Sequence, residues 1–208
     1  MPSGVQPCSR FRMRSQTVIL SRLGKILAAD PREEFEGGTR RFLCREYVIG
    51  WIERSAANGV VAREAYAKAR PCQQAYVDKW PDDPNPLMLL AVTDAAVGRK
   101  DDAIQEASQA VARGLISQDT VEWASLAEEL VSVYVLVGER EQALRQLEVL
   151  EKVPRALNYG YLSRMPLYDA LRGEPRFQSL LARLGPLPIE NRNESSRWFS
   201  RVCQVLQR

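Results

Sequence analysis

The sequence predicts an all-α fold, an α–α superhelix of about three helical hairpins closed by a C-terminal capping helix. Apolar residues recur at spacings of three and four along the middle of the chain, which is the period of a helix that buries one face. Two such segments resemble each other, and in both a glycine followed by four polar residues separates two apolar stripes. We therefore expect paired helices throughout residues 42–184 and no strand between Phe42 and Leu184.

The composition limits the function classes. The chain has 208 residues, of which 45% are hydrophobic and 26% charged, and it contains no histidine. That length can bury a sizeable core. The missing histidine removes Ser-His-Asp and Cys-His nucleophile pairs, histidine-ligated zinc and a histidine general base. We expect a protein that is not an enzyme and has no cofactor, metal or small-molecule substrate; carboxylate or lysine chemistry is the alternative that the sequence leaves open.

The cysteines predict a reducing compartment. Cys8, Cys44, Cys72 and Cys203 lie far apart, and no two of them form a C-x-x-C pair. Four unpaired thiols are typical of a cytoplasmic protein, so the expected localisation is cytoplasmic. No apolar run approaches the ~18 residues that a membrane span needs.

The chain divides into three regions: a basic leader at 1–41, a repeat domain at 42–184 and a tail at 185–208. The leader begins with 29 residues that contain no acid and resemble a transit peptide, but a helix-forming or poorly ordered leader explains the same residues and is preferred. A remnant of an upstream domain and a fourth, degenerate hairpin are further alternatives. Nucleic-acid binding through Arg10–Arg41 is disfavoured because the basic bias is weak.

The first hairpin is expected between residues 42 and 80. Its first helix covers residues 42–55 and ends at Asn58-Gly59, and its second helix runs from Val61 to Trp80. Pro71 should kink or split that second helix, because proline cannot donate the helical hydrogen bond. The buried stripe of the second helix comprises Ala62, Ala65, Tyr66 and Ala69.

The second and third hairpins each turn at a glycine. Gly98 and Gly138 are expected to adopt the left-handed backbone conformation that only glycine adopts freely. Ala91 and Ala103 lie on opposite sides of the first of these turns. Small residues at both positions let the two helices approach closely, so a bulky replacement there should wedge the helices apart.

These hairpins carry a family resemblance. The sequence resembles the tetratricopeptide repeat, a 34-residue pair of antiparallel helices. Its two turn glycines are forty residues apart, so about six extra residues lie around Leu115–Thr120. The departures are Asp94, where an aromatic residue is usual, and Leu87, where tryptophan is usual. The matching positions of the two copies are Ala91, Gly98, Ala103 and Ala110, then Val131, Tyr134, Gly138, Ala143 and Leu150.

The segment from Met165 to Leu184 resembles the closing segment of bacterial signalling proteins whose repeat arrays follow kinase, cyclase or DNA-binding domains. Pro175 suits the first position of a helix, and Gly185-Pro186 should stop that helix. Its apolar stripe would cover the open end of the array. The stripe comprises Phe177, Leu180, Leu181 and Leu184. The tail beyond it is expected to contain a short amphipathic helix around Trp198–Leu206. Docking on the array or fraying is preferred, and contact with a partner or an anionic membrane surface is the alternative.

The resemblance implies a non-catalytic scaffold that binds a protein or peptide on the concave face of the repeats. The alternative is a regulatory fragment of a bacterial signalling kinase, cyclase or transcriptional regulator. The groove suits an apolar or basic peptide, because its residues are small, apolar or weakly acidic. The residues that the resemblance places in this groove are Asn85, Met88, Val92, Ala95, Ser125, Glu128, Ser132 and Val135. The sequence does not indicate the oligomeric state.

Overall fold

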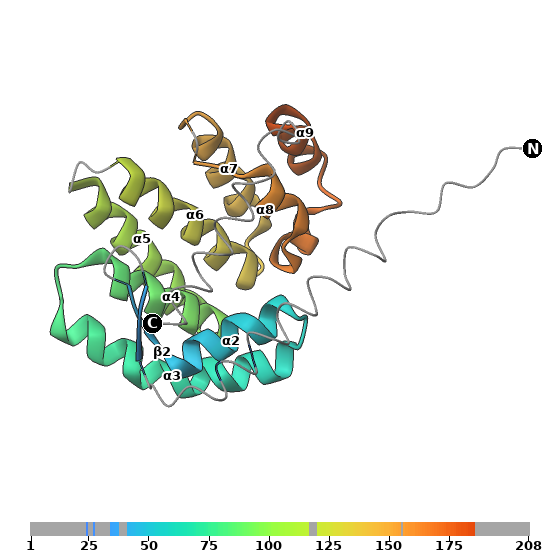
Figure 1. Ribbon diagram of the computed structural model, residues 1–208. Coiled ribbons are helices and arrows are strands. Elements are labelled where there is room, and N and C mark those ends of the chain that lie inside the picture. Colours follow the sequence, from blue (N-terminus) through green and yellow to red (C-terminus); the bar gives the residue numbers. More distant parts are fainter. Residues whose placement is uncertain are drawn as a thin grey trace, which may run out of the picture.

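The fold is that of a computed structural model, which describes residues 24, 27, 34–37, 41–116, 120–154 and 156–185. Most of the basic leader, the tail beyond Gly185, Cys8, Cys203 and the expected helix around Trp198–Leu206 lie outside the described residues. Helices make up most of what is described, so the predicted all-α class is confirmed at that level. Figure 1 shows the helices following one another from α2 and α3 at the bottom to α7 and α9 at the top.

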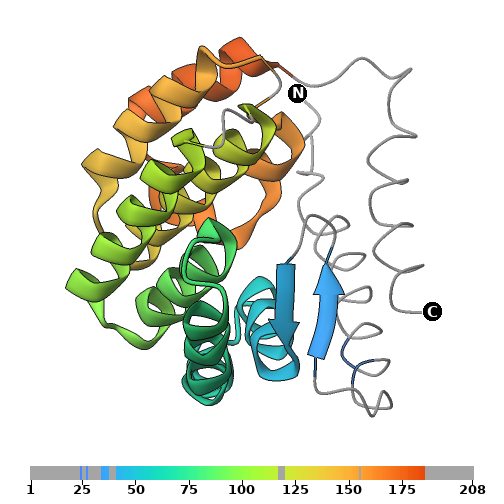
Figure 2. The ribbon, with the colours of Figure 1, turned by 90° about the vertical axis from the view of Figure 1, so that its left-hand side faces the viewer.

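The chain enters this helical body through a short β-hairpin. Strand β1 (Glu34–Gly37) pairs antiparallel with β2 (Arg41–Cys44), with Glu34 opposite Cys44. The expectation of a helix from residue 42, with no strand after Phe42, is therefore wrong at its start. The preceding segment offers β2 a pairing partner, and this pairing overrides the local helical pattern. Figure 2 shows the two strands beside α2.

The first helical pair consists of α2 (Arg45–Ser55) and α3 (Gly59–Lys79). The predicted alanine and tyrosine stripe of α3 is buried. Pro71 is expected to kink or split the second helix. The split does not occur, because α3 runs through Pro71 as one helix, and the kink stays a prediction. Pro71 lies on the exposed side of α3, while Ala69 and Gln73 on either side of it are buried. Burial of both flanking turns outweighs the hydrogen bond that the proline cannot donate.

The second and third pairs follow the predicted pattern closely. They consist of α4 (Pro84–Val97) with α5 (Lys100–Ile116), and α6 (Thr120–Leu136) with α7 (Arg140–Glu151). Gly98 and Gly138 have φ angles of 95° and 82°, so the predicted left-handed turns are confirmed. Ala91 and Ala103 are fully buried in one core cluster, as expected for closely packed helices.

Glycines mark two further sites where neighbouring helices approach closely. A Cβ atom added at Gly50 of α2 would lie 2.9 Å from the ring of Tyr66 on α3. A Cβ atom added at Gly114 of α5 would lie 2.5 Å from Leu126 Cδ1 on α6. Both distances are too short for a real methyl group, so the spacing of these helices depends on the absence of a side chain.

The last described part of the chain, up to Gly185, packs against α6 and α7. It contains α8 (Tyr159–Arg164), the 3-10 helix η1 (Pro166–Leu171) and α9 (Pro175–Leu184). Phe177 and Leu180 of α9 are buried, which confirms the predicted stripe. Three ion pairs between α9 and α7 reinforce this contact: Arg176 with Glu141 and with Glu148, and Arg183 with Glu151.

Contacts between consecutive pairs connect the two large core clusters through α6. Helix α3 contacts α4, α5 contacts α6, and α4 also contacts α6. Helix α6 contributes to both large core clusters, with Leu126 and Val133 in the N-terminal one and Val131 and Val135 in the C-terminal one. The first and last parts of the array also meet, because α2 contacts η1.

The α2–α3 turn yields a stability prediction. Ala57 has a φ angle of 63°, a left-handed conformation that costs a residue with a side chain roughly 1–2 kcal/mol. Ala57→Gly should therefore raise the free energy of unfolding by about 0.5–1 kcal/mol after the extra entropy of glycine is deducted. Gly98→Ala should lower it by about 1–2 kcal/mol. Urea unfolding of both variants measures this; a loss of stability in Ala57→Gly would contradict the assignment of strain.

Candidate functional site

The four predicted groove residues of α4 do not line an open groove. Asn85, Met88, Val92 and Ala95 are exposed by only 4, 1, 2 and 4%. The expectation of an accessible surface there needs correction, because every residue of α4 from Asn85 to Ala95 is buried. Helices α3, α5 and α6 and strand β2 surround α4. The sequence carried a signal for this: residues 85–95 have no polar face, and a helix without one is buried on all sides.

Asn85 forms hydrogen bonds that hold two helices together. Its Nδ2 atom donates hydrogen bonds to Asp83 Oδ1 and to Glu122 Oε1, both at 3.0 Å. Its backbone N–H donates to Asp83 Oδ1, which caps α4. Asn85 therefore links the start of α4 to the start of α6.

The four predicted groove residues of α6 divide into two groups. Ser132 and Val135 are buried, with exposed fractions of 7 and 9%, whereas Ser125 and Glu128 are half-buried. Helix α6 contacts η1, so the C-terminal part of the chain lies against this helix. Of the eight predicted residues, only Ser125 and Glu128 keep an appreciable exposed surface.

A group of polar side chains gathers where the two ends of the array meet, and we call it the inner cluster. Its members come from α2, α3, α6, α8 and η1 and interact electrostatically with one another. Burial raises the pKa of Tyr66, and burial together with the carboxylate of Glu128 raises the pKa of Tyr161 to about 12. The inner cluster comprises Arg54, Tyr66, Glu128, Glu129, Tyr161 and Tyr168.

Sequence reasoning missed most of this cluster. Glu128 was predicted to face the groove, but Arg54, Tyr161 and Tyr168 had not been singled out. They lie outside the two repeat copies, on the helices at the two ends of the array. The contact between α2 and η1 joins segments more than a hundred residues apart, and no local pattern reports such a contact.

Asp94 forms a second charged network on the α3–α4–α5 side. Its side chain is fully buried and accepts two hydrogen bonds from Arg70, at 2.6 and 3.1 Å. Arg99 lies 3.3 Å from the same carboxylate and also pairs with Asp102. Asp94, where the repeat family usually has an aromatic residue, therefore forms the centre of an ion-pair network with Arg70 and Arg99.

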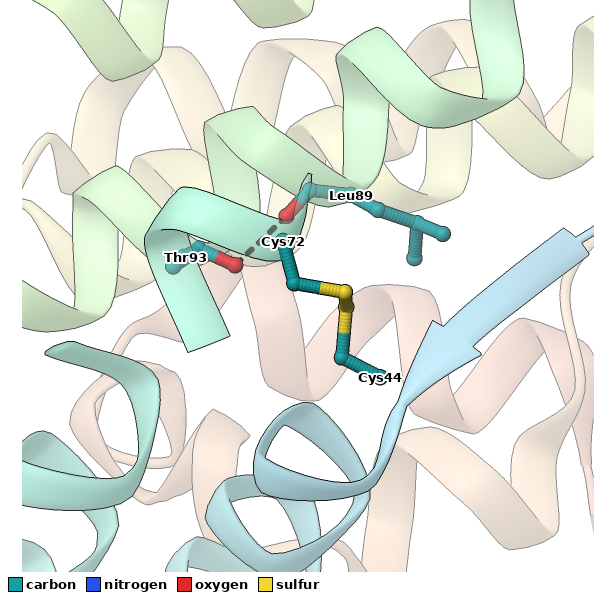
Figure 3. Close-up of a disulfide and its surroundings, with 4 residues drawn as sticks. All are labelled: Cys44, Cys72, Leu89 and Thr93. Atoms are coloured by element: carbon teal, nitrogen blue, oxygen red, sulfur yellow. Dashed lines mark hydrogen bonds between the residues drawn. A yellow bond between two sulfur atoms is a disulfide. The ribbon is translucent and has the colours of Figure 1, made fainter. Parts of the chain in front are cut away.

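Cys44 and Cys72 form a disulfide, with their Cα atoms 6.4 Å apart. The expectation of four unpaired thiols is therefore wrong for this pair. The cysteines no longer support the expected reducing compartment. The two residues are 28 positions apart, and only the fold brings β2 against the middle of α3. Figure 3 shows the bond beside Leu89 and Thr93 of α4, whose own hydrogen bond runs from Thr93 Oγ1 to the Leu89 carbonyl.

On the rest of the described surface, the features that could bind a metal ion or a ligand are groups of ligating side chains and hollows. Within the described ranges, no group of three or more His, Cys, Asp or Glu residues is placed to hold a metal ion. A shallow hollow of about 310 Å³ lies between α7 and α9, but its charged residues Glu148, Arg176 and Arg183 are already ion-paired. Among the helices that are described, none combines the length and apolarity needed to cross a bilayer.

Comparison with known proteins identifies no relative. No protein-family model, curated protein or solved structure matches the chain.

The Asp94 network yields a pH prediction. Burial, followed by the charge of Asp94, raises the pKa of Glu106 to about 7, and Glu106 Oε2 is buried without a hydrogen bond. The native state therefore favours the protonated carboxyl, and its stability should fall as pH rises from about 4.5 to 7. Arg70 and Arg99 partly offset this loss.

Glu106→Gln should remove that part of the pH dependence and stabilise the protein above pH 7. Thermal unfolding from pH 4.5 to 8 measures the effect, and Glu64→Gln at an exposed position of α3 is the control. Equal pH profiles for the two variants would contradict the burial of an ionisable Glu106.

Proposed function

We propose that the chain is a non-catalytic helical scaffold, similar to a tetratricopeptide-repeat superhelix, that binds a protein partner. The observation that carries the proposal is the stacking of successive helical pairs through small residues. Ala91, Ala103 and Ala110 are fully buried between neighbouring helices, and Gly114 admits Leu126 of the next pair. Stacked helical pairs present extended surfaces, and binding of peptides and proteins is their usual use.

The α6 face beside the inner cluster is the surface proposed for the partner. Ser125 and Glu128 are half-buried there, so a partner can reach them without unfolding α6. Glu128 and Glu129 contribute negative charge to this face, and their charge adds to the effect of burial, which is the main cause of the raised pKa of Tyr161. A partner segment with a basic and an apolar side chain fits this surface best.

The proposal is tested by site-specific cross-linking. A photoreactive benzoylphenylalanine is placed at position 125 of the full chain, and cross-linked proteins are identified after irradiation in the cells that make it. The matched control carries the same group at position 108, where an exposed serine of α5 lies on another helix. We expect one predominant cross-linked protein from position 125 and none of it from position 108.

A charge substitution then tests the chemistry of the contact. Glu128→Lys should weaken capture of that protein at least about tenfold if a basic side chain pairs with Glu128, since a buried like-charge contact costs several kcal/mol. Glu64→Lys on α3 should leave capture unchanged. Equal cross-linking from positions 125 and 108, or equal capture by both lysine variants, would remove the α6 face as the binding surface.

A further inference from the structure

Helix α2 is the element that covers Tyr66, the aromatic member of the inner cluster on α3. The ring of Tyr47 meets the Tyr66 ring edge-on at 5.4 Å, and the Arg54 guanidinium lies 5.6 Å from its centre. Gly50 allows α2 to lie directly on the same ring. Tyr66 has no exposed surface as a result. Displacement of α2 would therefore expose Tyr66 and the side of the inner cluster next to it.

The sequence of α2 makes a weak helix. It has 11 residues, fewer than the roughly 12–15 that an isolated helix needs in water. Val48, Ile49 and Ile52 are β-branched and Gly50 lacks a side chain, and all of these residues disfavour a helix. Its N-cap residue, Cys44, makes no side-chain capping bond. At its other end the left-handed position is occupied by Ala57, where the two later turns have glycine.

The disulfide holds the N-terminal end of this weak helix in place. Cys44 directly precedes the first residue of α2, and Cys72 lies in the middle of α3, so the bond fixes the start of α2 to α3 (Figure 3). A disulfide stabilises a fold by limiting the freedom of the unfolded chain. This one also joins the start of α2 directly to its neighbouring helix.

We propose that the Cys44–Cys72 disulfide is a redox-controlled clasp that holds α2 over Tyr66, and that its reduction uncovers this side of the inner cluster and so enlarges the surface that the partner contacts beside α6. This inference rests on the proposed function for its consequence, but the clasp itself is a property of the chain alone. The proposal requires that loss of the bond loosens α2 and leaves the α4–α9 core intact.

The chemistry requires a dithiol reductant. One thiolate of the reductant attacks Cys72 Sγ, since Cys72 is partly exposed and Cys44 is only 3% exposed. The S–S bond breaks, Cys44 leaves as a thiolate and takes up a proton, and a mixed disulfide remains on Cys72. The second thiol of the reductant displaces Cys72, so that two protein thiols form and the dithiol becomes a disulfide. Two electrons and two protons pass from the reductant to the protein.

Hydrogen exchange of the full chain, with and without dithiothreitol, tests the clasp. Reduction should speed amide exchange in α2 on the order of tenfold or more, while exchange in α9 stays unchanged. Hydroxyl-radical labelling should reach Tyr66 after reduction, whereas Phe177, an equally buried residue of α9, should stay protected. Cys44→Ser and Cys72→Ser should each show the reduced behaviour without reductant, and Cys8→Ser with Cys203→Ser should keep the response.

Two results would overturn the clasp: no change in α2 exchange on reduction, or an equal rise in α2 and α9, which would mark a global loss of stability. Cross-linking from position 125, repeated in cell extract with the oxidised and the reduced chain, separates this inference from the proposed function. Equal cross-linking from position 125 in the oxidised and reduced states would leave the scaffold standing and remove its redox control. Faster α2 exchange without any cross-link in either state would support the clasp and remove the binding role of the α6 face.

Discussion

The close approach of helices at small residues is the constraint on which the rest of the structure depends. Tyr66 can lie under α2 only because Gly50 has no side chain, and Leu126 can enter α5 only because Gly114 has none. Ala91 and Ala103 play the same part between α4 and α5. Because dispersion forces fall steeply with distance, a spacing set by glycine and alanine gives these helices their contact area. The buried position of α4 and the assembly of the inner cluster both follow from it.

Features encoded within one hairpin could be predicted from the sequence. Gly98 and Gly138 follow apolar stripes and precede polar residues, and this local pattern is enough to place a left-handed turn. The amphipathic stripe of α9 is equally local, and Phe177 and Leu180 are buried as expected. In each case the residues that decide the structure lie within about two helical turns of one another.

Features that depend on distant contacts could not be predicted. The strand β2 exists because Glu34–Gly37 pairs with it, and Cys44 reaches Cys72 because that strand lies against α3. The groove residues of α4 were assigned from their positions within the repeat that the sequence resembles. Those positions line a groove only where the inner face of the helices is open. Here α3, α5, α6 and β2 surround α4, so that Met88 and Val92 are covered. The binding role of the two accessible residues, Ser125 and Glu128, stays a prediction.

The free energy of unfolding of Ala103→Leu tests the packing account most directly, with Ala112→Leu as the matched variant. Both residues lie on α5, but Ala103 is fully buried against α4 whereas Ala112 is exposed. Overpacking at a closely spaced helix contact should cost Ala103→Leu about 1–3 kcal/mol in urea unfolding, while Ala112→Leu should change stability by less than about 0.5 kcal/mol. Equal stability of the two variants would contradict the claim that small residues set the spacing of these helices.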